Sequence, residues 1–234
     1  MSAIVPIHAV LFDLDGTLVD SEIHTDTAIR VVAERHGAPG FSLDHTETRG
    51  RTWQHVADVM RARTGIAADP AALADELLSY WSEIAADVSP VPGSPDAIRE
   101  AARSLRLAVV SSSPKPVIDA FLGKLGIADC IGPAARIGGD MVARSKPDPE
   151  GFLKGARALG AEPSASLVFE DSRAGLLAAR AAGMRSMFIT CCAADIPGNT
   201  PLATATCTDY RSLPAQFWAR IADGSLDLAG KSFA

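Results

Sequence analysis

Four carboxylate residues stand directly after two short apolar segments, at a spacing that could hold a divalent metal. The segments are 9–12 and 167–169, and the carboxylates that follow them are Asp13, Asp15, Glu170 and Asp171. Four carboxylates gathered in one place would repel one another unless a cation lies among them or some are protonated. Mg²⁺ prefers oxygen ligands and keeps several of its waters, which suits a few carboxylates and a backbone carbonyl. We therefore expect Mg²⁺ as the cofactor.

A hydroxyl and an ammonium group complement this acidic set. Ser111 follows the apolar segment 107–110, and Lys146 precedes a helix-like stretch. They would supply a hydrogen-bond donor and a positive charge where phosphate oxygens lie. Phosphoryl transfer also needs a carboxylate that attacks phosphorus and a second group that moves the proton. Asp13 and Asp15 can fill those two roles, because residues two apart on an extended chain face the same side.

Short strands and helices are expected to position these groups. Apolar runs with the length of buried strands lie at 9–12, 107–110, 167–169 and 187–190. Helix-like stretches lie at 95–105, 116–125, 150–159 and 173–182, and several are followed by a glycine that can end a helix. This alternation predicts an α/β fold with a doubly wound parallel sheet that helices cover on both faces. Ligands of such a sheet bind at the carboxyl ends of its strands, where the polar residues stand.

The segment 21–87 interrupts the alternation. It is rich in alanine, reads as helix, and contains no apolar run of strand type. We predict that 21–87 is an inserted all-helical domain, and that 1–20 and 88–234 together form the α/β core. The proline- and glycine-rich stretch 89–93 is expected to act as one hinge and 19–21 as the other. The tail from about residue 223 is expected to fray.

The composition and net charge argue against nucleic-acid-binding, membrane-spanning and disulfide-rich proteins. The chain has 234 residues, of which 47% are hydrophobic, and its 22 Lys and Arg against 28 Asp and Glu give a net charge of −6. An acidic chain is not expected to bind nucleic acid. No apolar run approaches the ~18 residues of a membrane-spanning helix, so no membrane partner is expected. The four cysteines form neither a metal spacing nor a disulfide framework, which predicts a cytoplasmic protein. The oligomeric state stays open, with a monomer favoured.

The stretch 12–21, FDLDGTLVDS, resembles the first motif of the haloacid dehalogenase superfamily, in its branch of Mg²⁺-dependent phosphatases and phosphomutases. Three further motifs of that superfamily resemble 109–111, Lys146 and 169–172, in the same order. The resemblance covers nearly the entire chain. It implies a Rossmann-like core and identifies 21–87 as a helical cap that closes over the substrate and opens to release product.

The resemblance also implies roles for the motif residues. Asp13 would be the nucleophile and Asp15 the general acid and base. Ser111 and Lys146 would hold the phosphate. The metal ligands would be Asp13, Asp15 through its carbonyl, and Asp171, with Glu170 acting nearby or through water.

A cap segment is expected to contact the substrate. The stretch 48–52 matches, more loosely, the segment with which related beta-phosphoglucomutases touch their substrate. Arg49, Gly50 and Arg51 are therefore substrate-binding candidates, and Ser112 is a fourth from the core. Charges on a helical cap are also common as solvated side chains, and Ser112 could equally belong to a plain loop.

Several activities compete. A dehalogenase lacks the second aspartate of the first motif, so Asp15 argues against that activity. A phosphomutase needs a second anion site in the cap, yet 66–95 contains no Lys or Arg and Trp53 stands where related mutases carry an arginine. We therefore favour hydrolysis of a small phosphorylated metabolite, with a sugar phosphate as one candidate. A phosphomutase stays open because Arg49 and Arg51 could bind a distal phosphate, and a non-catalytic phosphometabolite-binding protein is the second alternative.

Overall fold

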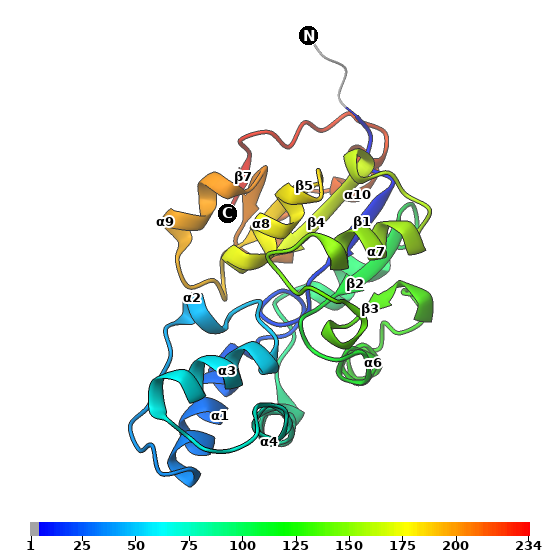
Figure 1. Ribbon diagram of the computed structural model, residues 1–234. Helices are drawn as coiled ribbons and strands as arrows, with labels where there is room; N and C mark the ends of the chain where they lie inside the picture. Colours follow the sequence, from blue (N-terminus) through cyan, green and yellow to red (C-terminus); the bar gives the residue numbers. More distant parts are fainter. Residues whose placement is uncertain (1–4) are drawn as a thin grey trace.

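The computed structural model describes residues 5–234, and a seven-stranded parallel sheet forms its centre (Figure 1). The strand order is β3-β2-β1-β4-β5-β6-β7. The four strands at the middle are almost entirely buried, which explains why each reads as a continuous apolar run rather than an alternating one. The predicted doubly wound parallel sheet is confirmed. The strands are β1 (Ala9–Phe12), β2 (Arg106–Val110), β3 (Arg136–Ile137), β4 (Ser166–Glu170), β5 (Arg185–Ile189), β6 (Ala205–Cys207) and β7 (Ser232–Phe233).

Helices cover both faces of the sheet, and neighbouring residues of β1 show the two sides. Leu11 faces α7, where a Cβ on Gly155 would come within 2.8 Å of Leu11 Cδ2, so the glycine lets the helix lie close. Phe12 faces the opposite way, with its ring centroid 6.3 Å from that of Trp218 in α10. The helices are α1 (Glu22–Arg35), α2 (His45–Thr48), α3 (Trp53–Thr64), α4 (Pro70–Ile84), α5 (Ser94–Ala101), α6 (Lys115–Lys124), α7 (Glu150–Ala158), α8 (Arg173–Ala181), α9 (Ile196–Asn199) and α10 (Phe217–Ala222).

The order of the strands reverses beside β1. Strands β2 and β3 follow on one side of it, and β4 to β7 follow on the other. A reversal of this kind separates the connections and opens a crevice at the carboxyl ends of the strands. Asp13 directly follows β1, Ser111 follows β2, and Glu170 ends β4, so the sheet brings these three residues to that crevice.

Helices α1 to α4 form a group apart from the sheet (Figure 1). Of these, α1, α3 and α4 share an apolar cluster that includes Val32, Met60 and Leu77. Local sequence explains the boundaries of α3 and α4: Gly65 ends α3 with a φ of 74°, and the Asp69 side chain accepts from two backbone N–H groups at the start of α4. The chain enters and leaves this group along paired segments, since the Asp20 N–H donates to the Ser89 carbonyl at 2.9 Å.

The expectation that the tail frays is wrong. Leu226 and Leu228 are buried in the main core, with 8% and 1% of their surface exposed. Beyond them β7 pairs with β6, and the Thr208 N–H donates to the Phe233 carbonyl at 2.9 Å. The tail therefore extends the sheet by one strand. Among the described residues, no helix has both the length and the apolar composition that crossing a membrane requires.

Candidate active site

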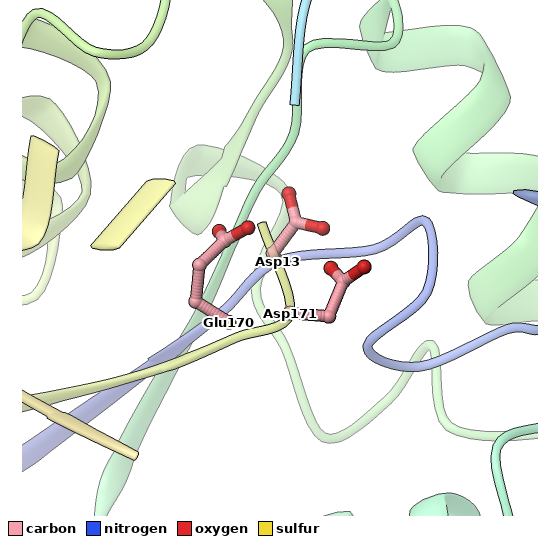
Figure 2. Close-up of side chains that lie close together, drawn as sticks. All are labelled: Asp13, Glu170 and Asp171. Carbon is pink, nitrogen blue, oxygen red and sulfur yellow. The ribbon is translucent and has the colours of Figure 1, made fainter. Parts of the chain in front are cut away.

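Three carboxylates converge at the switch point of the sheet (Figure 2). Asp13, Glu170 and Asp171 each offer one oxygen, and these oxygens all lie within 4.8 Å of one another. All three residues are at most 4% exposed. Burial, and then the neighbouring Glu170 charge, raise the pKa of both Asp13 and Asp171 well above the usual value. The cluster therefore stabilises a cation, because each ionised carboxylate is costly without one.

Lys146 supplies one positive charge to this cluster. Its ammonium group pairs with Asp13 Oδ1 and lies 2.8 Å from Glu170 Oε2. Burial would lower the pKa of Lys146, but the two carboxylates raise it above its ordinary value, so the side chain stays protonated. Together with the Arg49 guanidinium, whose Nη1 lies 4.0 Å from Asp171 Oδ2, it gives two cationic groups for three carboxylates, which leaves a deficit of positive charge.

Asp171 offers a carboxylate oxygen that suits a further cation. Its Oδ1 accepts a hydrogen bond from Thr17 Oγ1 at 3.2 Å, whereas its Oδ2 is buried without a hydrogen-bond partner among residues 5–234. A buried carboxylate oxygen left in this way is costly unless something else binds it. Gly16 leaves space beside it: φ is +79°, and a Cβ there would lie 2.3 Å from Asp171 Oδ2. An all-oxygen donor set of this kind suits a hard divalent ion.

Glu170 is already occupied on both oxygens. Oε2 faces Lys146, and Oε1 accepts from the backbone N–H and the hydroxyl of Ser172 at 3.1 and 2.6 Å. Its place in the cluster is thus fixed by the start of α8, which begins just after Ser172. This arrangement suits a residue that supports the metal site from beside it.

Asp15 lies outside the carboxylate cluster and faces hydroxyl groups. Its Oδ1 accepts from Ser21 Oγ at 2.7 Å, and its Oδ2 accepts from Ser113 at 2.9 Å and Ser111 at 3.3 Å. Burial raises the pKa of Asp15, while the hydroxyl hydrogen bonds lower it, and burial dominates. A carboxyl group with a raised pKa holds its proton more readily than an ordinary aspartic acid, which suits a proton donor. A metal contact through the Asp15 carbonyl stays a prediction.

Sequence reasoning missed Ser113 and Ser21 as partners of Asp15. Ser113 was the easier of the two to predict, because it stands two residues after Ser111 and can therefore face the same side of the chain. Ser21 adjoins the first motif. Both lie at the carboxyl end of the sheet because the segments after β1 and β2 turn into the crevice there.

A small cavity of about 40 Å³ lies between the sheet and helices α1 to α4. At roughly 10–15 Å³ for one water, it holds about three water molecules, far less than the roughly 300 Å³ of an ordinary ligand pocket. A metabolite of several heavy atoms therefore needs the helical group to move. The cavity is lined by Asp13, Asp15, Glu22, Thr25, Thr48, Gly50, Arg51, Trp53, Val56, Trp81, Ser112 and Ser113.

The candidate substrate residues lie where the helical group meets the core. Ser112 Oγ donates to the Gly50 carbonyl at 2.8 Å, and Arg51 donates to the Lys146 carbonyl at 3.1 Å. The cavity is lined by Gly50, Arg51 and Ser112, among others. Arg49 lies instead beside the carboxylate cluster, with its Nη1 4.0 Å from Asp171 Oδ2. The stretch 49–51 thus contacts the core directly.

Glu22 is a further residue that sequence reasoning missed. It begins α1, lines the cavity, and lies 3.5 Å from Arg49 Nε. Burial raises the pKa of Glu22 to about 8, although the Arg49 charge lowers it. Only its closeness to the first motif could have pointed to it.

Comparison with known proteins gives a consistent result. The sequence model of the family described as haloacid dehalogenase-like hydrolase matches residues 7–183. The chain is 34% identical over 186 residues to validoxylamine A 7'-phosphate phosphatase of Streptomyces hygroscopicus subsp. limoneus, covering 77% of this chain and 84% of that protein. It is 31% identical over 176 residues to a fructose-1-phosphate phosphatase of Escherichia coli, covering 75% and 92% of the two chains.

Solved structures share the fold. A beta-phosphoglucomutase from Clostridium difficile superposes with a TM-score of 0.77 at 22% identity, covering 94% of this chain and 98% of that one. At this identity the likeness concerns the fold alone. A structure of CbbY from Rhodobacter sphaeroides in complex with phosphate is 27% identical with a TM-score of 0.66, covering 78% and 86% of the two chains.

Proposed function

The chain belongs to the haloacid dehalogenase-like hydrolases, as its four motifs predicted, and we propose that it is a Mg²⁺-dependent phosphatase acting on a small phosphate monoester. One observation carries the proposal: Asp13 and Asp15 stand two residues apart in different surroundings. Asp13 lies among carboxylates beside Lys146, where a phosphoryl group would meet a cation, and Asp15 lies among hydroxyls. Such a difference is what separates a nucleophile from a proton donor.

Asp13 attacks phosphorus in the first step. A bond forms between its carboxylate oxygen and phosphorus while the bond from phosphorus to the leaving oxygen breaks, which gives an aspartyl-phosphate. Lys146 holds Asp13 in place and offsets negative charge on the phosphate oxygens. A divalent ion held by Asp13 and Asp171, with Glu170 beside them, would supply the remaining charge neutralisation.

Asp15 moves the proton. It donates to the leaving oxygen in the first step, and it then accepts a proton from the water that attacks the aspartyl-phosphate and releases inorganic phosphate. Its raised pKa favours the protonated form that the first step requires. Ser21 and Ser113 hold the carboxyl group while its charge changes.

We assign 21–87 as a cap and 1–20 with 88–234 as the catalytic core. The apolar cluster that α1, α3 and α4 share and the small cavity beside them support a cap that opens for substrate and closes to exclude water. A phosphorylated carbohydrate or a related polyol is the proposed substrate, because relatives are named for phosphates of this kind. The four free cysteines support a reducing, cytoplasmic location.

The experiment is a screen of sugar phosphates with Mg²⁺ that scores both phosphate release and isomer formation. Release of phosphate that Asp13→Asn and Asp13→Ala abolish supports the proposal, and the exposed Asp96→Asn is the matched control that keeps full activity. Isomer formation that depends on a bisphosphate primer would assign a phosphomutase instead. A protein that only binds phosphometabolites would release no phosphate and would assemble no trigonal metal fluoride on Asp13.

Asp15 has a sharper test with p-nitrophenyl phosphate, whose leaving group needs no proton. Asp15→Asn should release about one equivalent of nitrophenolate and then stall as the aspartyl-phosphate, because the attacking water lacks its base. Full steady-state turnover by this variant would overturn the assignment of Asp15.

A further inference from the structure

Two adjacent thiols lie one residue beyond the end of β5, outside the proposed catalytic machinery. The Cys191 and Cys192 sulfur atoms are 3.6 Å apart. Cys191 is exposed and Cys192 is half-buried, so reagents in solution can reach the pair. Nothing in the proposed phosphatase reaction uses either thiol.

A tight turn holds the pair next to the active site. The Ala193 N–H donates to the Thr190 carbonyl, which makes the two cysteines the central residues of the turn. The Thr190 and Cys191 N–H groups donate to carbonyls of the segment 207–208, both at 3.0 Å, so the start of the turn is anchored to the sheet. The Cys192 carbonyl projects from this anchored turn and accepts from the guanidinium of Arg49.

Arg49 makes this turn a contact between cap and core. It stands at the end of α2, also faces Glu22 at 3.5 Å, and reaches Asp171 Oδ2 at 4.0 Å. The Cys192 main-chain carbonyl is thus one of the few core groups that Arg49 binds directly. A change in the conformation of residues 191–192 must displace this acceptor.

We propose that Cys191 and Cys192 form a redox modification site, in which a vicinal disulfide releases Arg49 and loosens the contact between cap and core. The oxidant is a low-molecular-weight disulfide such as glutathione disulfide. The Cys191 thiolate attacks one of its sulfurs, which forms a mixed disulfide and releases one thiolate. Cys192, after giving its proton to solvent, attacks the Cys191 sulfur, which forms the vicinal disulfide and releases the second thiolate.

The geometry explains why Cys191 reacts first and why the vicinal disulfide changes the backbone of the turn. The Cys192 thiol donates a hydrogen bond that lowers the pKa of Cys191, and Cys191 is the more exposed of the two. Adjacent Cα atoms are about 3.8 Å apart across a trans peptide, shorter than the roughly 4.4–6.8 Å of ordinary disulfides. Closing the ring therefore twists the backbone of the turn, and the bond is readily reduced.

The experiment uses the full-length protein, glutathione disulfide and intact mass spectrometry with peptide mapping. Wild type should lose two hydrogens in the peptide that contains both cysteines, and dithiothreitol should restore them. Cys191→Ser should lose this two-electron oxidation, and Cys192→Ser should stop at the glutathione adduct on Cys191. Cys130→Ser is the matched control and should oxidise like wild type.

Hydrogen exchange of the segment 48–52 measures the coupling to the cap without any need for catalysis. Losing one hydrogen bond to a charged group should speed its exchange about tenfold in the oxidised protein, with reversal by dithiothreitol. Cys191→Ser should show no change on the same treatment, because Arg49 binds a main-chain carbonyl that this variant retains.

Two results would overturn the proposal: a disulfide from either cysteine to Cys207 or Cys130, or formation of the vicinal disulfide with unchanged exchange at 48–52. Both readouts are independent of the phosphatase assay. A chain that proves not to be a phosphatase would therefore leave this test intact.

Discussion

Lys146 is the residue whose removal gives the most direct test of how the carboxylate cluster is held. It is 6% exposed and pairs with Asp13 and Glu170, which are themselves buried. Lys146→Met keeps a side chain of similar length and removes the charge together with its hydrogen bonds to Asp13 and Glu170. The variant leaves two buried carboxylates without their cation.

The expected loss of stability is large. Removing one partner of a buried ion pair costs about 3–5 kcal/mol, because the other charge stays buried and unpaired. For a chain of 234 residues, each kcal/mol lowers the melting temperature by about 2–4 °C, so the drop should be roughly 6–20 °C. The exposed Lys124, which pairs with the fully exposed Asp87, is the matched control, and Lys124→Met should cost less than about 1 kcal/mol.

The stability difference between wild type and Lys146→Met depends on pH. Burial and Glu170 already raise the pKa of Asp13, and Lys146 is the group that lowers it. Without Lys146 the folded-state pKa of Asp13 rises further above its unfolded value of about 4, so the variant holds this proton to a higher pH than wild type, and its extra cost of folding grows as pH rises. The difference in stability between wild type and Lys146→Met should therefore shrink from about pH 8 to about pH 5.5.

The assay is thermal unfolding in metal-free buffer at both pH values and again with Mg²⁺. Mg²⁺ should recover part of the loss, because it binds the folded cluster and replaces some of the missing charge. A melting temperature within about 2 °C of wild type at high pH, or a deficit that grows as pH falls, would refute the pairing of Lys146 with these carboxylates.

Three further predictions concern other parts of the molecule. Gly16→Ala should raise the Mg²⁺ concentration for half-maximal activity about 10- to 100-fold, measured by titration, because its Cβ would lie 2.3 Å from Asp171 Oδ2. The pKa of Glu22 is raised from 4.5 to about 8, so the free energy that folding loses by burying this carboxyl group grows as pH rises from 4.5 to about 8. Between about pH 5.5 and 7.5, denaturant unfolding of wild type should therefore lose about 2 kcal/mol more than Glu22→Gln. Leu228→Ala should lower the free energy of unfolding by about 2–5 kcal/mol in urea, since Leu228 is 1% exposed, and a loss below about 1 kcal/mol would contradict its place in the core.

The central strands could be predicted because burial on both faces makes each of them an uninterrupted apolar run. Strands β1, β2, β4 and β5 were found in this way, within two residues at each end. Strands β3, β6 and β7 were missed because they have only two or three residues, too few for any pattern. The tail was misjudged for a similar reason: Leu226 and Leu228 are isolated apolar residues in a polar stretch, and only the neighbouring core shows that they are buried.

The convergence of Asp13, Glu170 and Asp171 could be predicted because parallel strands bring their carboxyl ends to one edge. The three hydrogen bonds that join the segment 49–51 to the rest of the chain could not, because their acceptors are main-chain carbonyls of Gly50, Lys146 and Cys192.

A main-chain carbonyl is present at every residue, so no residue type marks it in a sequence. It also survives every side-chain substitution, which means that variants at Gly50 or Cys192 leave the acceptor in place. These contacts must therefore be probed from the donor side, at Ser112, Arg51 and Arg49, or by a modification that moves the backbone itself. The Cys191–Cys192 pair offers the second route, because closing its ring displaces an acceptor that no substitution at that position removes.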